Sequence, residues 1–249
     1  VLQSSSLVLV LSVGLVSTGL LSFKQTLGII LGANIGTTVT GEIMAFSHYI
    51  PEYAFVVIGI ILLFINHRVI FGVGAILVGL GSVFVALEGF ESLASLLAPM
   101  PIIAEGIKYA VHEPLIGVVI GTIVSGIIQS SSATIGITMS FLNEGIIPIT
   151  PSIGILLGAN IGTCVTALIA IIGAKNEAKL VAMAHIWFNV IGVLIFLPFL
   201  GSLAALADLL AATSKEQLAH ISVLFNIFCT VIFLPFLKPF ESFIRKLHA

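Results

Sequence analysis

Gln129-Ser130-Ser131-Ser132 repeats, inside otherwise apolar sequence, the stretch Gln3-Ser4-Ser5-Ser6. A second stretch, Leu157 to Thr163 with the sequence LGANIGT, repeats the stretch from Leu31 to Thr37. The residue numbers differ by 126 in both pairs, so the two motifs were copied together. Most of the repeated residues are Gln, Ser, Asn, Thr and Gly, which a membrane interior ordinarily excludes.

The duplication extends beyond these two motifs. When residues 1–46 are aligned without a gap with residues 127–172, 17 of the 46 positions are identical, which is more than shared hydrophobicity alone would give. A duplicated polar element at membrane depth is typical of transporters that are built from repeats.

The composition is that of an integral membrane protein. Hydrophobic residues make up 59% of the 249 positions and charged residues only 8%, whereas about 25% of the residues of soluble domains are charged. A soluble protein of this composition, with a mean hydropathy of +1.26, would lack the polar surface needed to cover its apolar residues. The apolar stretches show no strand alternation, so we expect an all-α fold whose helices satisfy their own backbone groups in lipid.

Charge, cysteine content and histidine placement exclude other classes. A net charge of −2 without a basic run gives no basis for nucleic-acid binding. Cys164 and Cys229 both lie in apolar stretches and provide no disulfide or metal framework. A serine hydrolase needs a base next to its nucleophile, but His185 and His220 are the only histidines in predicted core segments and neither is duplicated with the serines. We therefore predict that the protein is not an enzyme and needs no cofactor.

Several apolar segments are too short to cross a membrane. The segments expected to be helical are 4–21, 26–46, 53–65, 69–87, 114–128, 132–142, 152–172, 180–199 and 217–237. A crossing of about 30 Å of hydrocarbon needs around 20 residues. Segments 114–128 and 132–142 flank the second serine tract and fit the two arms of a re-entrant helical hairpin, which is tolerated only where protein or a water-filled cavity surrounds it. We expect an integral membrane transporter with re-entrant hairpins and discontinuous helices.

The distribution of positive charge gives an orientation. We treat each serine tract as part of a hairpin that returns to its own side of the membrane. The segments that cross the membrane are then 26–46, 53–65, 69–87, 152–172, 180–199 and 217–237. With these crossings, one side of the membrane receives Lys24, Arg68, Lys175, Lys179, Lys238, Arg245 and Lys246. The other side receives only Lys108 and Lys215. The positive-inside rule then predicts a cytoplasmic C-terminus. Three crossings separate the two hairpins, so the copies enter from opposite faces and form an inverted repeat.

We predict three parts: a first inverted repeat at residues 1–87, an interfacial connector at 88–113 and a second inverted repeat at 114–249. The connector is more polar than the rest. Residues 114–128 precede Gln129, whereas only Val1 and Leu2 precede Gln3. A symmetric site would need the same arm in both copies, so we expect the native polypeptide to extend upstream of Val1.

The duplicated motifs carry groups that suit ion binding. Serine hydroxyls and Gln and Asn amides both donate and accept hydrogen bonds. At the start of a half-helix, where backbone N–H groups lack partners, they form a neutral cage for an anion. Nearby carbonyl, Asn and Thr oxygens suit a hard monovalent cation. Because no Lys or Arg falls in a predicted core segment, helix N-termini and co-bound cations must offset the charge of the anion, which favours cation-coupled transport over an anion pore.

Packing is the main alternative for these residues. Spacings such as Gly32/Gly36 and Gly158/Gly162 are common at contacts between transmembrane helices, and such a spacing in isolation favours packing. A run of four polar residues that occurs twice favours a ligand site, because burial of unpaired polar groups is costly.

Other polar residues of the apolar segments have two interpretations each. Glu42 fits either a coupling residue or an exposed helix end. His185 and Asn189 share a helix face, where an interhelical hydrogen bond is favoured over a place in the transport pathway, and the same interpretation applies to His220 and Asn226. Phe225-Asn226 also repeats Phe188-Asn189, with the same spacing to a following proline.

The paired motifs resemble those of the type II sodium–phosphate cotransporter family, including its bacterial members, over about 1–46 and 114–237. The resemblance implies an inverted-repeat carrier of inorganic phosphate with sodium. It implies that phosphate is held by Gln3, Ser4, Ser5, Ser6, Gln129, Ser130, Ser131 and Ser132. It suggests that sodium is bound by Asn34, Thr37, Thr38, Asn160 and Thr163, with Asn189 as a contributor.

The chain departs from the family pattern in three ways. Cys164 stands where the first copy has the hydroxyl of Thr38, which weakens a cation-ligand role there. Val56 stands where the best local match would place the counterpart of Asn189. The arm upstream of the first serine tract is absent.

These patterns together predict a sodium-coupled inorganic phosphate symporter that works by alternating access, with phosphate between the two serine tracts. We expect a multi-pass protein of the cell inner (plasma) membrane, with sodium as coupling ion, and homo-oligomerisation is left open. One alternative is a carrier for another small anion or with another coupling ion. Another is a membrane phosphate sensor or scaffold that does not transport.

Overall fold

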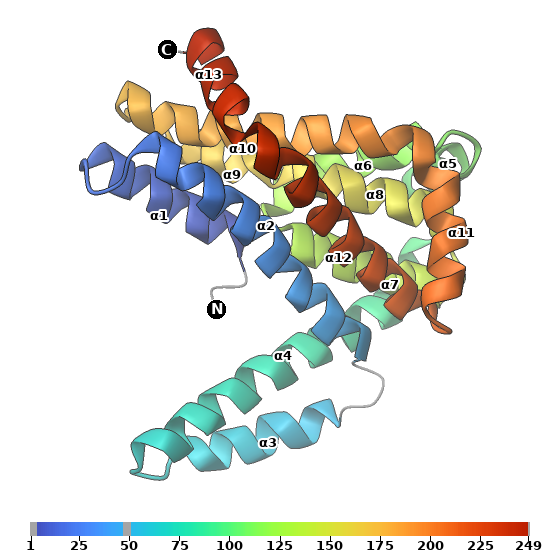
Figure 1. The fold of residues 1–249 in the computed structure, drawn as a ribbon. Coiled ribbons are helices and arrows are strands. Elements are labelled where there is room, and N and C mark those ends of the chain that lie inside the picture. The colour runs from blue at the N-terminus through green and yellow to red at the C-terminus, as the bar shows by residue number, and fades with distance from the viewer. Residues whose placement is uncertain (1–3, 47–50, 249) are drawn as a thin grey trace.

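The computed structural model describes residues 4–46 and 51–248, and these ranges contain helices and no strand (Figure 1). The α-helices are α1 (Ser5–Ser17), α2 (Phe23–Ala45), α3 (Glu52–Leu63), α4 (Arg68–Leu97), α5 (Pro101–His112), α6 (Pro114–Ile128), α7 (Ser131–Asn143), α8 (Ile149–Gly162), α9 (Cys164–Ala170), α10 (Asn176–Phe196), α11 (Leu200–Leu210), α12 (Ser214–Phe233) and α13 (Leu237–His248). Short 3₁₀ turns at Leu197–Phe199 and Leu234–Phe236 follow α10 and α12. The prediction of an all-α fold is confirmed.

Five helical stretches of the described chain are long and apolar enough to cross a membrane. They are Phe23–Ala45, Arg68–Ala94, Ile149–Ala170, Asn176–Leu210 and Ser214–His248, and they cover five of the six predicted crossings. The sixth, 53–65, corresponds to α3, whose 12 residues extend only about 18 Å at 1.5 Å per residue. Phe64, Ile76 and Ile123 are each more than half exposed, as expected of side chains that face lipid. The protein is therefore a multi-pass membrane protein.

The duplication in sequence extends to local structure. Helices α1 and α7 have 13 residues each, and their first residues, Ser5 and Ser131, differ by 126 in number. Gly19 and Gly145 end these helices with positive φ values of 80° and 68°, a conformation that glycine adopts without steric cost. The helices predicted on both sides of the second serine tract are present as α6 and α7.

The two copies differ after the turns at Gly19 and Gly145. Helix α2 is continuous over 23 residues. Its counterpart is interrupted at Thr163, where α8 ends and α9 begins. An interruption of one residue therefore occurs in the second copy only, within the part of the chain that the structure describes.

Glycines bring α6 and α8 into close contact. A Cβ atom at Gly158 would overlap the carbonyl oxygen of Val118, and one at Gly121 would overlap the carbonyl oxygen of Ile155. Gly32, which corresponds to Gly158, has nothing within 4 Å of the same position. The repeated glycines thus pack a helix pair in the second copy, whereas no described residue covers that face of α2.

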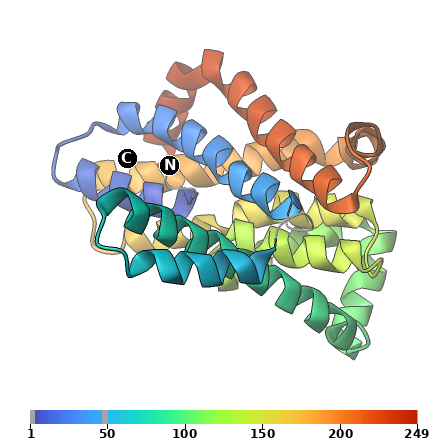
Figure 2. The same ribbon diagram turned by 90° about the horizontal axis from the view of Figure 1, so that it is seen from below.

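The first residues of the predicted connector at 88–113 belong to the preceding helix. Helix α4 continues to Leu97, and the rest of the connector forms α5. Helices α3 and α4 lie alongside each other and extend away from the other helices (Figure 1). Seen from below, the same pair lies in front of α1 in the view (Figure 2). The core forms around large buried side chains such as Phe188, Phe225 and Met139, and α4 contributes Phe84 and Leu87 to it.

Candidate functional site

Both serine tracts cap the start of a helix in the same way. The Oγ of Ser4 accepts a hydrogen bond from the backbone N–H of Leu7 at 3.3 Å. The Oγ of Ser130 accepts one from the N–H of Ala133 at 3.2 Å. Serine is a favoured residue at this position because its hydroxyl satisfies a backbone donor that the helix leaves free. The remaining free N–H groups of α1 and α7 and the helix dipoles favour negative charge near the two tracts.

Gln129 forms the turn between α6 and α7. Its φ of 58° is left-handed, and no other non-glycine residue of the described chain has a positive φ. Such backbone strain is often found at ligand sites. Its side chain is exposed. The corresponding Gln3 of the first copy lies outside the described residues.

The first serine tract contacts both copies of the LGANIGT motif. The N–H of Ser5 donates to the Oγ1 of Thr37 at 3.0 Å. The hydroxyls of Ser6 and Thr163 lie 3.0 Å apart, so the first tract reaches the interruption between α8 and α9. Thr37 in turn lines a pocket with Ser131 and Ser132 of the second tract. Both tracts therefore adjoin the same pair of Gly-Ala-Asn segments.

A small pocket between α2, α7, α8 and α12 collects many of the predicted site residues. It is lined by Asn34, Thr37, Thr38, Gly41, Ser131, Ser132, Ile135, Asn160, Ser222 and Asn226. Its size leaves room for about one water molecule. The lining contains hydroxyls and amides but no charged side chain. Of the predicted residues, Ser4, Ser5, Ser6, Gln129, Ser130, Thr163 and Asn189 do not line this pocket.

Asn34 belongs to a buried hydrogen-bond network that joins α2 to α10. Its Nδ2 donates to the Oδ1 of Asn189 at 3.1 Å, and its Oδ1 lies 3.3 Å from the Nε2 of His185. The Nδ2 of Asn189 donates to the carbonyl oxygen of His185 at 2.9 Å and lies 3.5 Å from the Sγ of Cys164. The predicted interhelical hydrogen bonds of His185 and Asn189 are confirmed. Cys164 is buried among them.

Substitution of Asn189 by alanine is expected to lower the free energy of unfolding by about 1–3 kcal/mol, because the Nδ2 of Asn34 loses its buried acceptor. Thermal unfolding of the purified protein in detergent would show this as a lower Tm. The exposed Asn143 at the end of α7 offers the same substitution without a buried partner, and Asn143→Ala should leave Tm unchanged. Equal Tm values for wild type and Asn189→Ala would contradict the network.

Two polar groups on α12 face α2 and the pocket. The Nδ1 of His220 lies 2.9 Å from the Oε1 of Glu42, and both side chains are half-buried. Here the predicted interhelical hydrogen bond of His220 is confirmed. Asn226 differs, because its Nδ2 donates to the carbonyl oxygen of Ser222 on the same helix and its Oδ1 has no partner. The prediction of an interhelical hydrogen bond for Asn226 is wrong.

Sequence reasoning left Ser222 and Asn226 out of the site. Both line the pocket beside Thr38 and Ser131. The repeat of Phe188-Asn189 as Phe225-Asn226 was the signal that could have added Asn226. Ser222 precedes Asn226 by one helical turn and so lies on the same face of α12.

Comparisons with known proteins agree with the duplicated motifs. The model of a family described as Na+/Pi-cotransporter matches residues 1–92 and 100–233. The uncharacterized protein YqeW of Bacillus subtilis (strain 168) is 38% identical over 223 residues, which are 90% of this chain and 73% of YqeW. No solved structure matches the chain.

Two further relatives have names that refer to phosphate. YjbB of Escherichia coli (strain K12), named as a candidate inorganic phosphate export protein, is 26% identical over 222 residues, or 89% of this chain and 41% of YjbB. Sodium-dependent phosphate transport protein 2B of Homo sapiens is 36% identical over 92 residues, or 34% of this chain and 13% of that protein. The chain thus spans about three quarters of YqeW but less than half of YjbB.

Proposed function

The chain belongs to the Na+/Pi-cotransporter family, a family of membrane transporters and not of enzymes, and we propose that it carries inorganic phosphate across a membrane together with sodium. The observation that carries the proposal is the arrangement of two serine-capped helix starts around one pair of Gly-Ala-Asn segments. Ser5 and Ser6 contact Thr37 and Thr163, and Ser131 lines the pocket that Thr37 shares.

We propose that phosphate binds between the two serine tracts. Hydroxyls and free N–H groups at the starts of α1 and α7 would hold its oxygens, and sodium at Asn and Thr oxygens would offset its charge. The pocket in the present conformation has room for about one water molecule, which is too little for a phosphate ion. Phosphate binding at the second tract therefore requires this pocket to widen, as a conformational change during alternating access would do.

The matching helix bounds support an inverted repeat with re-entrant hairpins. Helix α6 has 15 residues and α7 has 13, so each extends only about 20 Å. The turn at Gln129 then lies inside the membrane if both arms enter from one side. We propose that α6 and α7 form such a hairpin, that α1 is the second arm of its counterpart, and that the repeats occupy 1–87 and 114–249.

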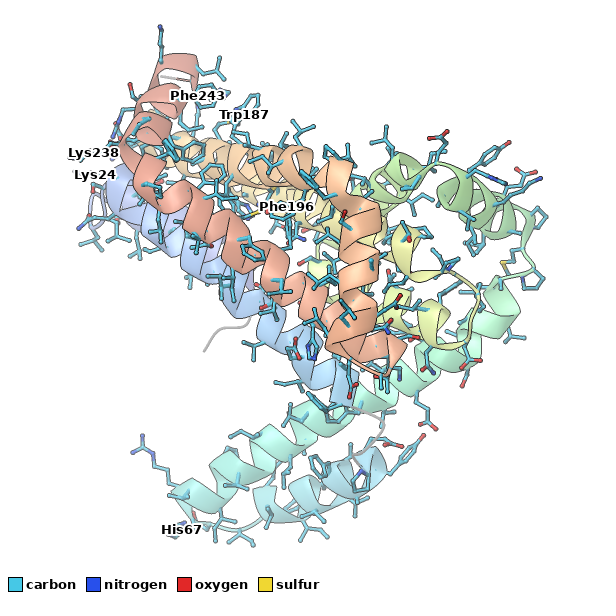
Figure 3. The ribbon with its side chains drawn as sticks, turned by 45° about the vertical axis from the view of Figure 1, so that its right-hand side comes forward. Lys24, His67, Trp187, Phe196, Lys238 and Phe243 are labelled. Atoms are coloured by element: carbon cyan, nitrogen blue, oxygen red, sulfur yellow. The ribbon has the colours of Figure 1, made fainter. Side chains whose placement is uncertain are left out.

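Contacts around α13 support a cytoplasmic C-terminus. Arg245 forms an ion pair with Glu177 near the start of α10 and lies 5.0 Å from the ring centre of Phe23 at the start of α2. These three helix ends carry Lys24, Lys175, Lys179, Lys238, Arg245 and Lys246. Figure 3 shows Lys24 and Lys238 close together, whereas His67, the neighbour of Arg68, lies at the tip of the α3–α4 pair, away from them. We propose that the protein lies in the cell inner (plasma) membrane and that the end with these positive charges, which includes the C-terminus, faces the cytoplasm.

Radiolabelled phosphate uptake into proteoliposomes tests the proposed function. We expect uptake to rise at least several-fold when a sodium gradient is directed inward and to fall when choline replaces sodium. Uptake that ignores sodium would indicate another coupling ion, and competition by a different anion would indicate another substrate. Absence of phosphate movement in either direction, with phosphate binding retained, would indicate a sensor. When the sodium gradient is reversed, phosphate efflux from the proteoliposomes shows whether the carrier also supports export, which is the direction given in the name of YjbB.

A further inference from the structure

Asn226 on α12 presents an amide oxygen to the pocket that no protein group satisfies. The side chain is 1% exposed, and its Nδ2 donates to the carbonyl oxygen of Ser222 at 2.9 Å. A carbonyl oxygen can only accept, so the amide nitrogen must be the atom that faces it. The Oδ1 is therefore turned away from its own helix, and it is buried without a hydrogen-bond partner.

Asn160 on α8 has the same arrangement on another side of this pocket. Its Nδ2 donates to the carbonyl oxygen of Leu156 at 2.9 Å, one helical turn earlier. That bond leaves its Oδ1 free, and no hydrogen bond within the described chain reaches this atom. Asn34 differs, because both atoms of its amide are engaged by α10 residues. The amides of Asn160 and Asn226 are thus held so that their oxygens can accept.

Hydroxyl oxygens complete the set. The Oγ1 of Thr38 donates to the carbonyl oxygen of Ile35 at 2.7 Å, which leaves its lone pairs free. Ser131, the buried serine of the second tract, lines the same pocket. All of these groups can present oxygen lone pairs, so the set suits a cation, while the hydroxyl of Ser131 can also donate a hydrogen bond to an anion.

The chemistry of the set selects the kind of cation. Neutral amide and hydroxyl oxygens suit hard cations, whereas zinc and related metals prefer nitrogen and sulfur ligands. No group of three or more His, Cys, Asp or Glu residues suited to a metal occurs in the described part of the chain. Without a carboxylate in the pocket, a monovalent ion is favoured over a divalent one. Room for about one water molecule also fits a single small ion without its hydration shell.

We propose that Asn226 and Asn160, with the hydroxyls of Thr38 and Ser131, form a sodium site that α12 completes. The proposal rests on the proposed function, since sodium is there the coupling ion. The family resemblance assigned no ligand to α12. Sodium bound here lies against Ser131, so its charge would draw phosphate to the second serine tract, and phosphate would in turn tighten sodium binding. Burial of an unpaired amide oxygen, which is otherwise unfavourable, then has a reason.

The sodium dependence of phosphate uptake tests this site. We expect Asn226→Ala to raise the sodium concentration for half-maximal uptake about 10-fold or more, while the KM for phosphate at saturating sodium stays close to that of the wild type. Asn226→Leu should behave alike, because leucine keeps the volume of the side chain and, like alanine, offers no oxygen to a cation. Thr230→Val is the matched control, because Thr230 is also buried on α12 with an unpaired hydroxyl but does not line the pocket. Its sodium dependence should equal that of the wild type.

A measurement without transport separates the possible failures. Sodium chloride, compared with choline chloride, should raise the Tm of the purified wild type and of Thr230→Val, but not of the two Asn226 variants. Sodium-driven uptake and stabilisation that are unchanged in both Asn226 variants would overturn the site while leaving the proposed function intact. A wild type that takes up phosphate without regard to sodium would overturn both.

Discussion

Replacement of Ser131 by alanine is expected to lower phosphate uptake about 10-fold or more while the protein remains folded. Ser131 is buried in the pocket between α2, α7, α8 and α12, and its hydroxyl lies where we propose that phosphate and sodium meet. A hydrogen bond to a charged ligand contributes about 1.5–3 kcal/mol, which corresponds to at least a 10-fold effect. Proteoliposome uptake at a fixed inward sodium gradient measures the change.

Helix α7 offers a matched control for this experiment. Ser140 is equally buried on the same helix, but its hydroxyl donates to the carbonyl oxygen of Gly136 and lies outside the pocket. Ser140→Ala should therefore transport phosphate like the wild type. Gln129→Gly removes the amide at the turn and keeps the left-handed backbone, since glycine accepts a φ of 58° readily. Normal uptake by both Ser131→Ala and Gln129→Gly would remove the support for a phosphate site at the second serine tract.

Gly158→Ala is expected to destabilise the protein strongly. A Cβ atom at this position would overlap the carbonyl oxygen of Val118, and a backbone atom in a helix cannot move aside as a flexible side chain can. Overpacking of this kind costs about 3 kcal/mol, which lowers the Tm of a chain of this size by roughly 6 °C or more. Thermal unfolding in detergent, followed by circular dichroism, would show the shift.

The duplicated sequence supplies the control for Gly158. Gly32 occupies the same place in the first LGANIGT motif, and nothing lies within 4 Å of the Cβ position there. Gly32→Ala should leave the Tm of this chain equal to that of the wild type or raise it by up to about 4 °C, because the added methyl group meets no neighbour and alanine favours a helix more than glycine does. A similar loss of Tm in both variants would mean that the glycines act through helix flexibility and not through the contact between α6 and α8.

Most of the fold follows from local features of the sequence. Long apolar runs predict helices because lipid offers no partner for backbone groups, and helices long and apolar enough to cross a membrane appear at five of the six places where a crossing is predicted. Serines ahead of an apolar run predict helix starts, and Ser4 and Ser130 cap α1 and α7. The segment at 53–65 forms a shorter helix, α3, of 12 residues, and its crossing of the membrane stays a prediction.

Roles of single polar residues were harder to predict, because they depend on neighbours far apart in sequence. Asn34 and Asn160 occupy identical places in the repeat. One is bonded to α10 through both amide atoms, whereas the other keeps a free oxygen beside the pocket. The cation role predicted for Asn34 and Asn189 remains a prediction, as does that of Thr37, Thr38, Asn160 and Thr163. Asn226 was assigned to helix contacts, yet its orphan oxygen faces the pocket.

Sequence alone thus established a helical membrane protein with two copies of one polar motif, because hydropathy and short-range capping are local properties of the chain. Which copies of Gly, Asn and Ser touch other helices, and which face the pocket, depends on the packing of α6 on α8 and of α12 beside α2. Those contacts join residues more than 30 positions apart, and identical motifs acquire different neighbours there. The structure therefore separates a glycine that packs from one that is open, and an amide that binds protein from one that is free to bind an ion.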